Sequence, residues 1–204
     1  MNEYLLSKDK QIKKIRRLFE ETENIQKSSG FYGGKLFFPI VNELRYCGNH
    51  VLNALALTNA EDIDCQLMEA EDHCNRAKYD AYECSIIVLT RKFEKFYDIY
   101  KTVGIPTIIP NFVEFIKLNQ SLQDFFRTNN KISIVNSEEK DKFLRNGLKQ
   151  LIDNIKTLEL IKPEADRKLT EIKNRIRKDR LKFLMGSILI PLVIAFITVI
   201  LTIR

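Results

Sequence analysis

Many of the sequence patterns that identify a known chemistry are missing from this chain. Its seven glycines form no phosphate-binding loop or dinucleotide fingerprint, and its two histidines belong to no Ser-His-Asp arrangement. The four cysteines form no CxxC pair, and a cytosolic compartment would keep them reduced, so we expect them to serve as small core residues. They are Cys47, Cys65, Cys74 and Cys84. The sequence also lacks strand-like alternation and internal repeats, which leaves helices as its main signal.

Charge is absent from one long segment near the carboxyl terminus. The stretch FLMGSILIPLVIAFITVILTI, residues 183–203, contains no ionisable side chain and lies between Lys182 and Arg204. As a helix it would be about 31 Å long, which matches a bilayer core of about 30 Å. The sequence therefore predicts a transmembrane helix and a tail-anchored protein. The charged amino terminus, MNEYLLSKDKQIKKI, does not resemble a signal peptide.

The basic residues are concentrated just before this apolar segment. The tract RKLTEIKNRIRKDRLK, residues 167–182, supplies most of the formal net charge of +6, and the rest of the chain is close to neutral. The positive-inside rule then places residues 1–182 in the cytoplasm. We expect a single-pass protein of the bacterial cytoplasmic membrane, since a Lys-, Asn- and Ile-rich composition is compatible with a low-GC bacterium. The lipid bilayer is its expected partner, and the near-neutral body does not support general RNA affinity.

Helical periodicity and breaker residues divide the rest of the chain. SSGFYGG (28–34), GIPTIIP and NNKISIVNS (129–137) are expected to be loops or connections, and Pro163 is expected to begin the last helix. Capping boxes are expected at Thr58 and Asn111. The predicted helices are 2–26, 35–57, about 58–100, 111–127, 138–161 and one from 163 into the apolar segment, with Gly186 and Pro191 as kink points.

The third of these helices has the clearest pattern. Apolar and small residues recur along it at alternating intervals of four and three, the signature of a left-handed coiled-coil seam. These residues are Ile63, Leu67, Ala70, Cys74, Ala77, Ala81, Cys84 and Val88. The predicted fold is all-α: a multi-helix bundle (1–162) with a long coiled-coil-like helix, a basic juxtamembrane helix (163–182) and a transmembrane helix (183–203).

Polar residues on the second and third helices form the candidate site. Glu43 and His50 are seven residues apart, hence on one face, while His73, Arg76 and Asp80 follow three-four spacing along the next helix. An antiparallel hairpin would let the two faces meet. They would then form either a functional cluster or an inter-helix network of salt bridges with a structural role.

One spacing within this region points to a family. Arg45-Tyr-Cys-Gly-Asn-His50 is an R-x4-H arrangement in a small all-α chain, and it resembles the motif of the HEPN superfamily, whose paired Arg and His residues cleave RNA without a metal ion. The resemblance implies that His50 is the acid-base group and Arg45 the phosphate clamp. Within one continuous helix the two residues lie about 140° apart, so they would converge only across a bundle or subunit contact.

The whole architecture also resembles membrane-bound accessory proteins of bacterial immune systems. This resemblance implies a non-enzymatic effector or scaffold that forms a homo-oligomer or a pore in antiviral defence or a stress response. The alternatives are a membrane-tethered ribonuclease using Arg45 and His50, and a SNARE-like tether, which Pro163 disfavours by interrupting the zipper. The protein partner is unknown. We expect no cofactor and no metal, although Cys47-x-x-His50 with His73 or Asp80 has the residue types of a zinc site.

Overall fold

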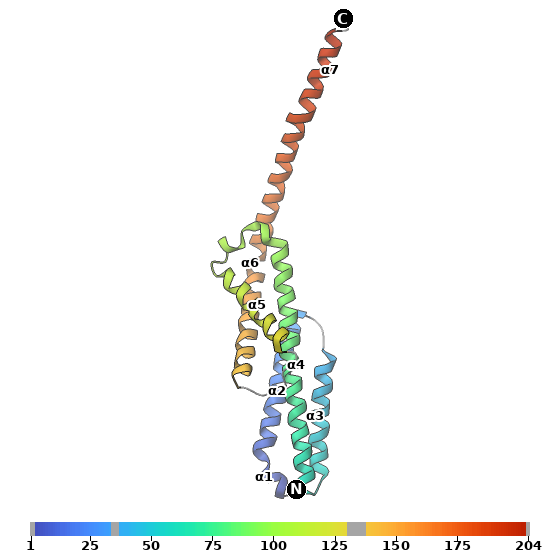
Figure 1. The fold of residues 1–204 in the computed structure, drawn as a ribbon, viewed down its shortest axis with the longest axis vertical. Coiled ribbons are helices and arrows are strands. Elements are labelled where there is room, and N and C mark those ends of the chain that lie inside the picture. Colours follow the sequence, from blue (N-terminus) through green and yellow to red (C-terminus); the bar gives the residue numbers. More distant parts are fainter. Residues whose placement is uncertain (1–2, 34–36, 130–137, 203–204) are drawn as a thin grey trace.

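The computed structural model describes residues 3–33, 37–129 and 138–202, and these residues form an all-α fold with one long helix projecting from it (Figure 1). The α-helices are α1 (Glu3–Ser7), α2 (Asp9–Gly33), α3 (Phe38–Ala56), α4 (Ala60–Tyr100), α5 (Phe112–Asn129), α6 (Glu138–Leu184) and α7 (Ile190–Thr202). Two 3-10 turns, Lys101–Val103 and Ile105–Thr107, connect α4 to α5, and a π-helical segment, Met185–Leu189, connects α6 to α7.

Helix α4 is the centre of the fold. It packs against α2 and α3 along its first half and against α5 and α6 along its second half (Figure 1). The predicted seam is confirmed as far as Ala81, because Ile63, Leu67, Ala70, Cys74, Ala77 and Ala81 are all buried. Cys84 and Val88, which were predicted to continue it, are only half-buried. The seam is therefore covered by helices of the same chain. Beyond Ala81 the buried face shifts to Tyr82, Ile86 and Leu89, as expected for a helix with 3.6 residues per turn.

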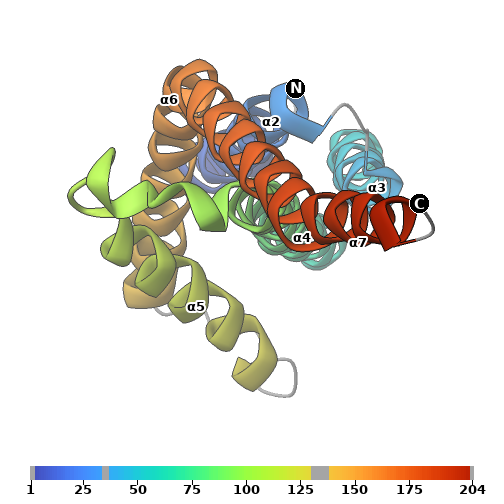
Figure 2. The same cartoon turned by 90° about the horizontal axis from the view of Figure 1, so that it is seen from above.

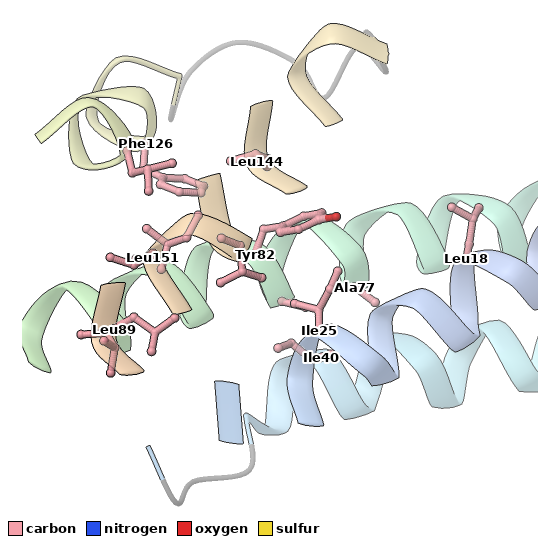
Figure 3. Packing of buried hydrophobic residues seen from close by; sticks show 14 of the residues in the cluster. Leu18, Ile25, Ile40, Ala77, Tyr82, Leu89, Phe126, Leu144 and Leu151 are labelled. Atoms are coloured by element: carbon pink, nitrogen blue, oxygen red, sulfur yellow. The ribbon is translucent and has the colours of Figure 1, made fainter. Parts of the chain in front are cut away.

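Helices α5 and α6 pack on the second half of α4. Tyr82, Leu89, Phe126, Leu144 and Leu151 converge there from three helices (Figure 3). Seen from above, α3 and α5 lie on different sides of α4 (Figure 2).

Helix α5 approaches α6 closely at Gly147. A Cβ atom at this position would come within 2.6 Å of Leu122 Cδ2. The glycine is therefore a packing contact between the two helices.

The helix boundaries differ from the predictions at three places. Asn59, rather than Thr58, caps α4, since its side chain accepts a hydrogen bond from the backbone N–H of Glu61 at 3.2 Å. Helix α2 continues to Gly33 through most of the predicted loop. Helix α6 runs through Pro163, and Leu158 and Ala165 are buried on either side of it. The packing of these side chains therefore outweighs the cost of the backbone hydrogen bond that is lost at proline. The predicted loop at 129–137 falls almost entirely outside the described residues.

The predicted carboxyl-terminal transmembrane helix is wrong. The apolar run is divided between the end of α6, the π-helical segment and α7, and α7 has 13 residues, about 20 Å of helix. Within residues 3–33, 37–129 and 138–202, no helix has the length and hydropathy needed to cross a bilayer. This finding also overturns the predicted tail anchor and the location in the bacterial cytoplasmic membrane.

The π-helical segment itself has a local cause. Pro191 lacks an N–H, and its ring would clash with the carbonyl of Ser187 in a regular α-helix. Widening the preceding turn relieves this clash, and such bulges are a common source of kinks. The expectation of irregularity around Gly186 and Pro191 matches this segment.

Candidate functional site

The candidate site lies on the α3–α4 hairpin, where polar side chains from both helices meet. A short connection, residues 57–59, makes the two helices antiparallel neighbours (Figure 1). Four of the residues singled out in the sequence come together on this surface: Glu43 and His50 from α3, and His73 and Arg76 from α4. We call this group, together with Gln66 and Glu69 of α4, the hairpin cluster.

Glu43 is the acceptor at one end of the hairpin cluster. Its Oε2 lies 2.8 Å from Nδ1 of His73 and 3.1 Å from Nε of Arg76, and its side chain is 24% exposed. Burial alone would raise the pKa of this carboxyl, but the hydrogen bonds from His73 and Arg76 outweigh burial and hold the pKa below its usual value. Glu43 is therefore ionised at neutral pH and holds the two α4 side chains in place.

The two histidines lie against each other. Their ring centroids are 5.1 Å apart, and the ring planes differ by 18°. Nδ1 of His50 is 2.9 Å from Oε1 of Gln66, and the ring of Tyr46 packs 5.3 Å from that of His73. Each imidazole is thus oriented by an oxygen acceptor contributed by the opposite helix.

Glu69 completes the cluster from α4. Within the described part of the chain, candidate ligand atoms of His50, Glu69 and His73 all lie within 4.8 Å of one another, and all three residues are half-buried. Neither Glu69 nor Gln66 was predicted from the sequence as a member of the site. The spacing of Glu69 and His73, four residues on one helix, was a usable signal, but α4 contains many acidic residues.

Arg45 and Asp80 do not join the cluster. Arg45 is exposed and stacks over Tyr46, with its guanidinium carbon 5.0 Å from the ring centroid, so one chain does not bring it to His50. Asp80 lies further along α4, and its carboxylate makes none of the hydrogen bonds that link the other members. Burial, and to a lesser extent the charges of Glu83 and Glu43, raise the pKa of Asp80.

The cysteines are not part of this surface arrangement. Cys47 and Cys74 are buried in the core, and their sulfur atoms are 2.9 Å apart. The zinc site considered in the sequence, Cys47-x-x-His50, is therefore not formed, because Cys47 points inward while His50 lies at the surface. Cys65 is exposed, and Cys84 is half-buried.

A second polar region lies in a groove of about 760 Å³ between α2 and α6, floored by α4. Lys78, which is buried, pairs with Asp141 at 2.8 Å, and Arg145 pairs with Glu21 at 2.6 Å. Tyr82 also donates to Glu21, at 3.2 Å. These pairs connect the three helices and alternate in sign, so the groove presents no single-sign surface for an ionic ligand.

Comparisons with protein families, with curated proteins and with solved structures find no match for this chain.

Proposed function

We propose that the protein is a non-enzymatic scaffold that forms a homo-oligomer through the end of its projecting helix. The observation that carries the proposal is a concentration of exposed apolar side chains in the last part of α6 and in α7. Leu181, Phe183, Leu184, Met185, Ile188, Leu189, Ile190, Leu192, Val193 and Ile197 are between 48% and 66% exposed. Exposed apolar surface of this extent is typical of an interaction site.

The distribution of these residues favours several copies of the same helix as the occupant. Ile188, Leu189 and Ile190 are consecutive, as are Leu192 and Val193, so they cover more than one side of the helix. One partner helix covers only one side, whereas a bundle of like helices covers them all. The seam of α4 is already buried within the chain and offers no competing surface. Without the membrane span, the resemblance to accessory proteins of bacterial immune systems rests on the helical bundle with Arg45 and His50, and on this basis we propose antiviral defence or a stress response as the setting.

The mass of the full-length protein tests this proposal. Sedimentation velocity should give a discrete species at a multiple of 23.9 kDa. The double variant Leu189→Glu/Leu192→Glu should shift it to the monomer, because several buried charges would face one another. The matched control is Leu160→Glu, which alters an apolar side chain of α6 that is 80% exposed, and should leave the mass unchanged. A wild-type monomer, or a mass that the double variant does not change, contradicts the proposal.

The alternative is a metal-independent ribonuclease that uses Arg45 and His50. One chain keeps these residues apart, so the alternative requires Arg45 of one copy to approach His50 of another. The exposed position of Arg45 is compatible with such a contact. The full-length protein should then cleave RNA in the presence of EDTA, and both Arg45→Ala and His50→Ala should abolish cleavage. Residual activity equal to wild type in either variant contradicts this alternative.

A further inference from the structure

We propose that His50, Glu69 and His73 form a binding site for a divalent transition-metal ion that links α3 to α4. Two imidazoles and a carboxylate converge from two helices, with candidate ligand atoms within 4.8 Å of one another. This is a different property from the self-association proposed above, and it does not depend on it.

His73 has one ring nitrogen free to bind a metal ion. Its Nδ1 lies 2.8 Å from the Glu43 carboxylate, and two lone pairs at this distance would repel, so Nδ1 carries the proton and donates it to Glu43. Nη2 of Arg76 also lies 3.0 Å from this nitrogen, while Nε of the same guanidinium donates to Glu43. The shorter contact is with the carboxylate, which can only accept, and it determines where the proton lies. In the neutral ring the other nitrogen, Nε2, then has a lone pair available for a metal ion.

The same reasoning applies to His50. Its Nδ1 lies 2.9 Å from Oε1 of Gln66, an oxygen that can only accept, so Nδ1 is the donor and Nε2 again has the lone pair. Metal-binding histidines in proteins typically donate their second N–H to a carboxylate or carbonyl oxygen in this way, which fixes the tautomer and the ring orientation. Here both histidines have such an acceptor, Glu43 in one case and Gln66 in the other.

The third ligand comes from the same face of α4. Glu69 precedes His73 by four residues, so the two side chains lie one turn apart and both face α3. A bound ion would lie about 2.0 to 2.2 Å from each ligand atom, which requires the three side chains to close by about 1 Å. All three are half-buried at the surface, so rotation of the side chains provides this movement.

The charges around the site are compatible with a cation. Arg76 lies beside His73, and its guanidinium is paired with Glu43. Glu69 adds a negative ligand.

Two nitrogens and one carboxylate oxygen favour zinc and similar transition ions over calcium or magnesium, which prefer oxygen ligands. The three protein ligands leave a position for water, and the ion would fasten α3, which packs mainly on α4, to the centre of the fold.

Titration of the metal-free full-length protein with Zn²⁺ tests the proposal, with Co²⁺ as a spectroscopic probe. We expect one ion per chain by isothermal titration calorimetry and a cobalt spectrum without thiolate charge-transfer bands. Zinc at about 100 times its dissociation constant should raise the ratio of folded to unfolded protein about 100-fold, because only the folded chain forms the site.

Variants separate this site from adventitious binding. His50→Ala and Glu69→Gln should each remove the bound ion, with helicity by circular dichroism as the check on folding. Gln66→Ala removes only the acceptor that orients His50 and should weaken binding about 10- to 100-fold. The matched controls are Glu61→Gln on the exposed face of α4 and Cys65→Ser, which removes the exposed thiol; both should bind as wild type does. Unchanged stoichiometry in His50→Ala or Glu69→Gln, loss in Cys65→Ser, or no binding by the wild type overturns the proposal.

Discussion

At the scale of single residues, the carboxyls of Glu43 and Asp80 should respond to acid in opposite directions. The pKa of Glu43 is held below its ordinary value of 4.5, so its ionised form stabilises the fold at neutral pH and this contribution is lost as the pH falls through the lowered pKa. The pKa of Asp80 is raised above 3.8, so its charge destabilises the fold at neutral pH and the penalty disappears on protonation. We expect Glu43→Gln to be less stable than wild type at neutral pH and Asp80→Asn to be more stable.

Urea unfolding of both variants as a function of pH checks this prediction. The extra stability of Asp80→Asn over wild type should shrink as the pH falls through the raised pKa of Asp80, and it should vanish below pH 3.8. The loss of stability in Glu43→Gln should persist down to pH 4.5 and become smaller only below that pH. Differences of the same sign for the two variants would contradict the assigned environments.

The buried Lys78–Asp141 pair should be asymmetric in its response to mutation. Lys78 has a side chain that is 10% exposed, whereas that of Asp141 is 33% exposed. Asp141→Asn leaves a buried ammonium without its counter-charge, and we expect it to lower the free energy of unfolding by about 1 to 3 kcal/mol. This is less than the loss when a fully buried pair is broken, because Asp141 is partly solvated. Lys78→Met replaces the charge with an apolar chain of similar volume and should change the free energy of unfolding by less than about 1 kcal/mol. Equal losses in the two variants, measured by urea unfolding, would show that the groove does not desolvate Lys78.

At the scale of helices, Gly147 and Gly48 should respond oppositely to the same substitution. Alanine is favoured over glycine in a helix by about 1 kcal/mol, and nothing lies within 4 Å of a Cβ atom at Gly48, so Gly48→Ala should stabilise the protein. A Cβ atom at Gly147 would lie 2.6 Å from Cδ2 of Leu122, and because Leu122 is fully buried its side chain would have to shift within the packed core. Gly147→Ala should therefore destabilise by about 1 to 3 kcal/mol. Thermal unfolding of the two variants measures both effects, and stabilisation by Gly147→Ala would mean that α5 and α6 are more loosely packed than the structure has them.

The helices and the seam of α4 were predictable because they depend on local periodicity. Residues from Ile63 to Ala81 repeat at the interval that one helical face requires, and they are buried as expected. Breaker residues were misleading where packing decides the outcome. The segment 28–34 was predicted to be a loop and Pro163 to begin a new helix, yet α2 continues to Gly33 and α6 runs through Pro163. The apolar run at 183–203 was misread for a related reason, since its composition does not reveal the π-helical interruption.

The hairpin cluster was half predictable. Spacing alone placed Glu43 with His50 and His73 with Arg76, and the short connection implied that the pairs meet. The register between the helices is not visible in the sequence, and it determines that His50 faces Gln66 and Glu69 of α4. Glu69 could not be distinguished beforehand from its acidic neighbours on α4, because its distinction is the partner on α3.

At the scale of the whole molecule, the basic tract and the apolar end of the projecting helix should have opposite effects on self-association. Arg175, Arg177, Lys178, Arg180 and Lys182 all lie exposed on α6, immediately before the apolar end. A parallel assembly of several copies through α7 would bring these basic residues close together. Their repulsion weakens the association that burial of the apolar side chains favours.

Self-association should therefore strengthen with salt. The screening length falls from about 10 Å at 0.1 M to about 3 Å at 1 M ionic strength, which removes repulsion between the basic tracts and leaves apolar burial largely intact. Sedimentation velocity should show a larger assembled fraction as sodium chloride is raised. Arg180→Glu/Lys182→Glu should reduce this salt dependence, while the control Lys149→Glu, on the part of α6 that lies along the bundle, should not change it. Association that weakens with salt would instead indicate that ion pairs between the basic tract and acidic surfaces hold the copies together, with α7 outside the interface.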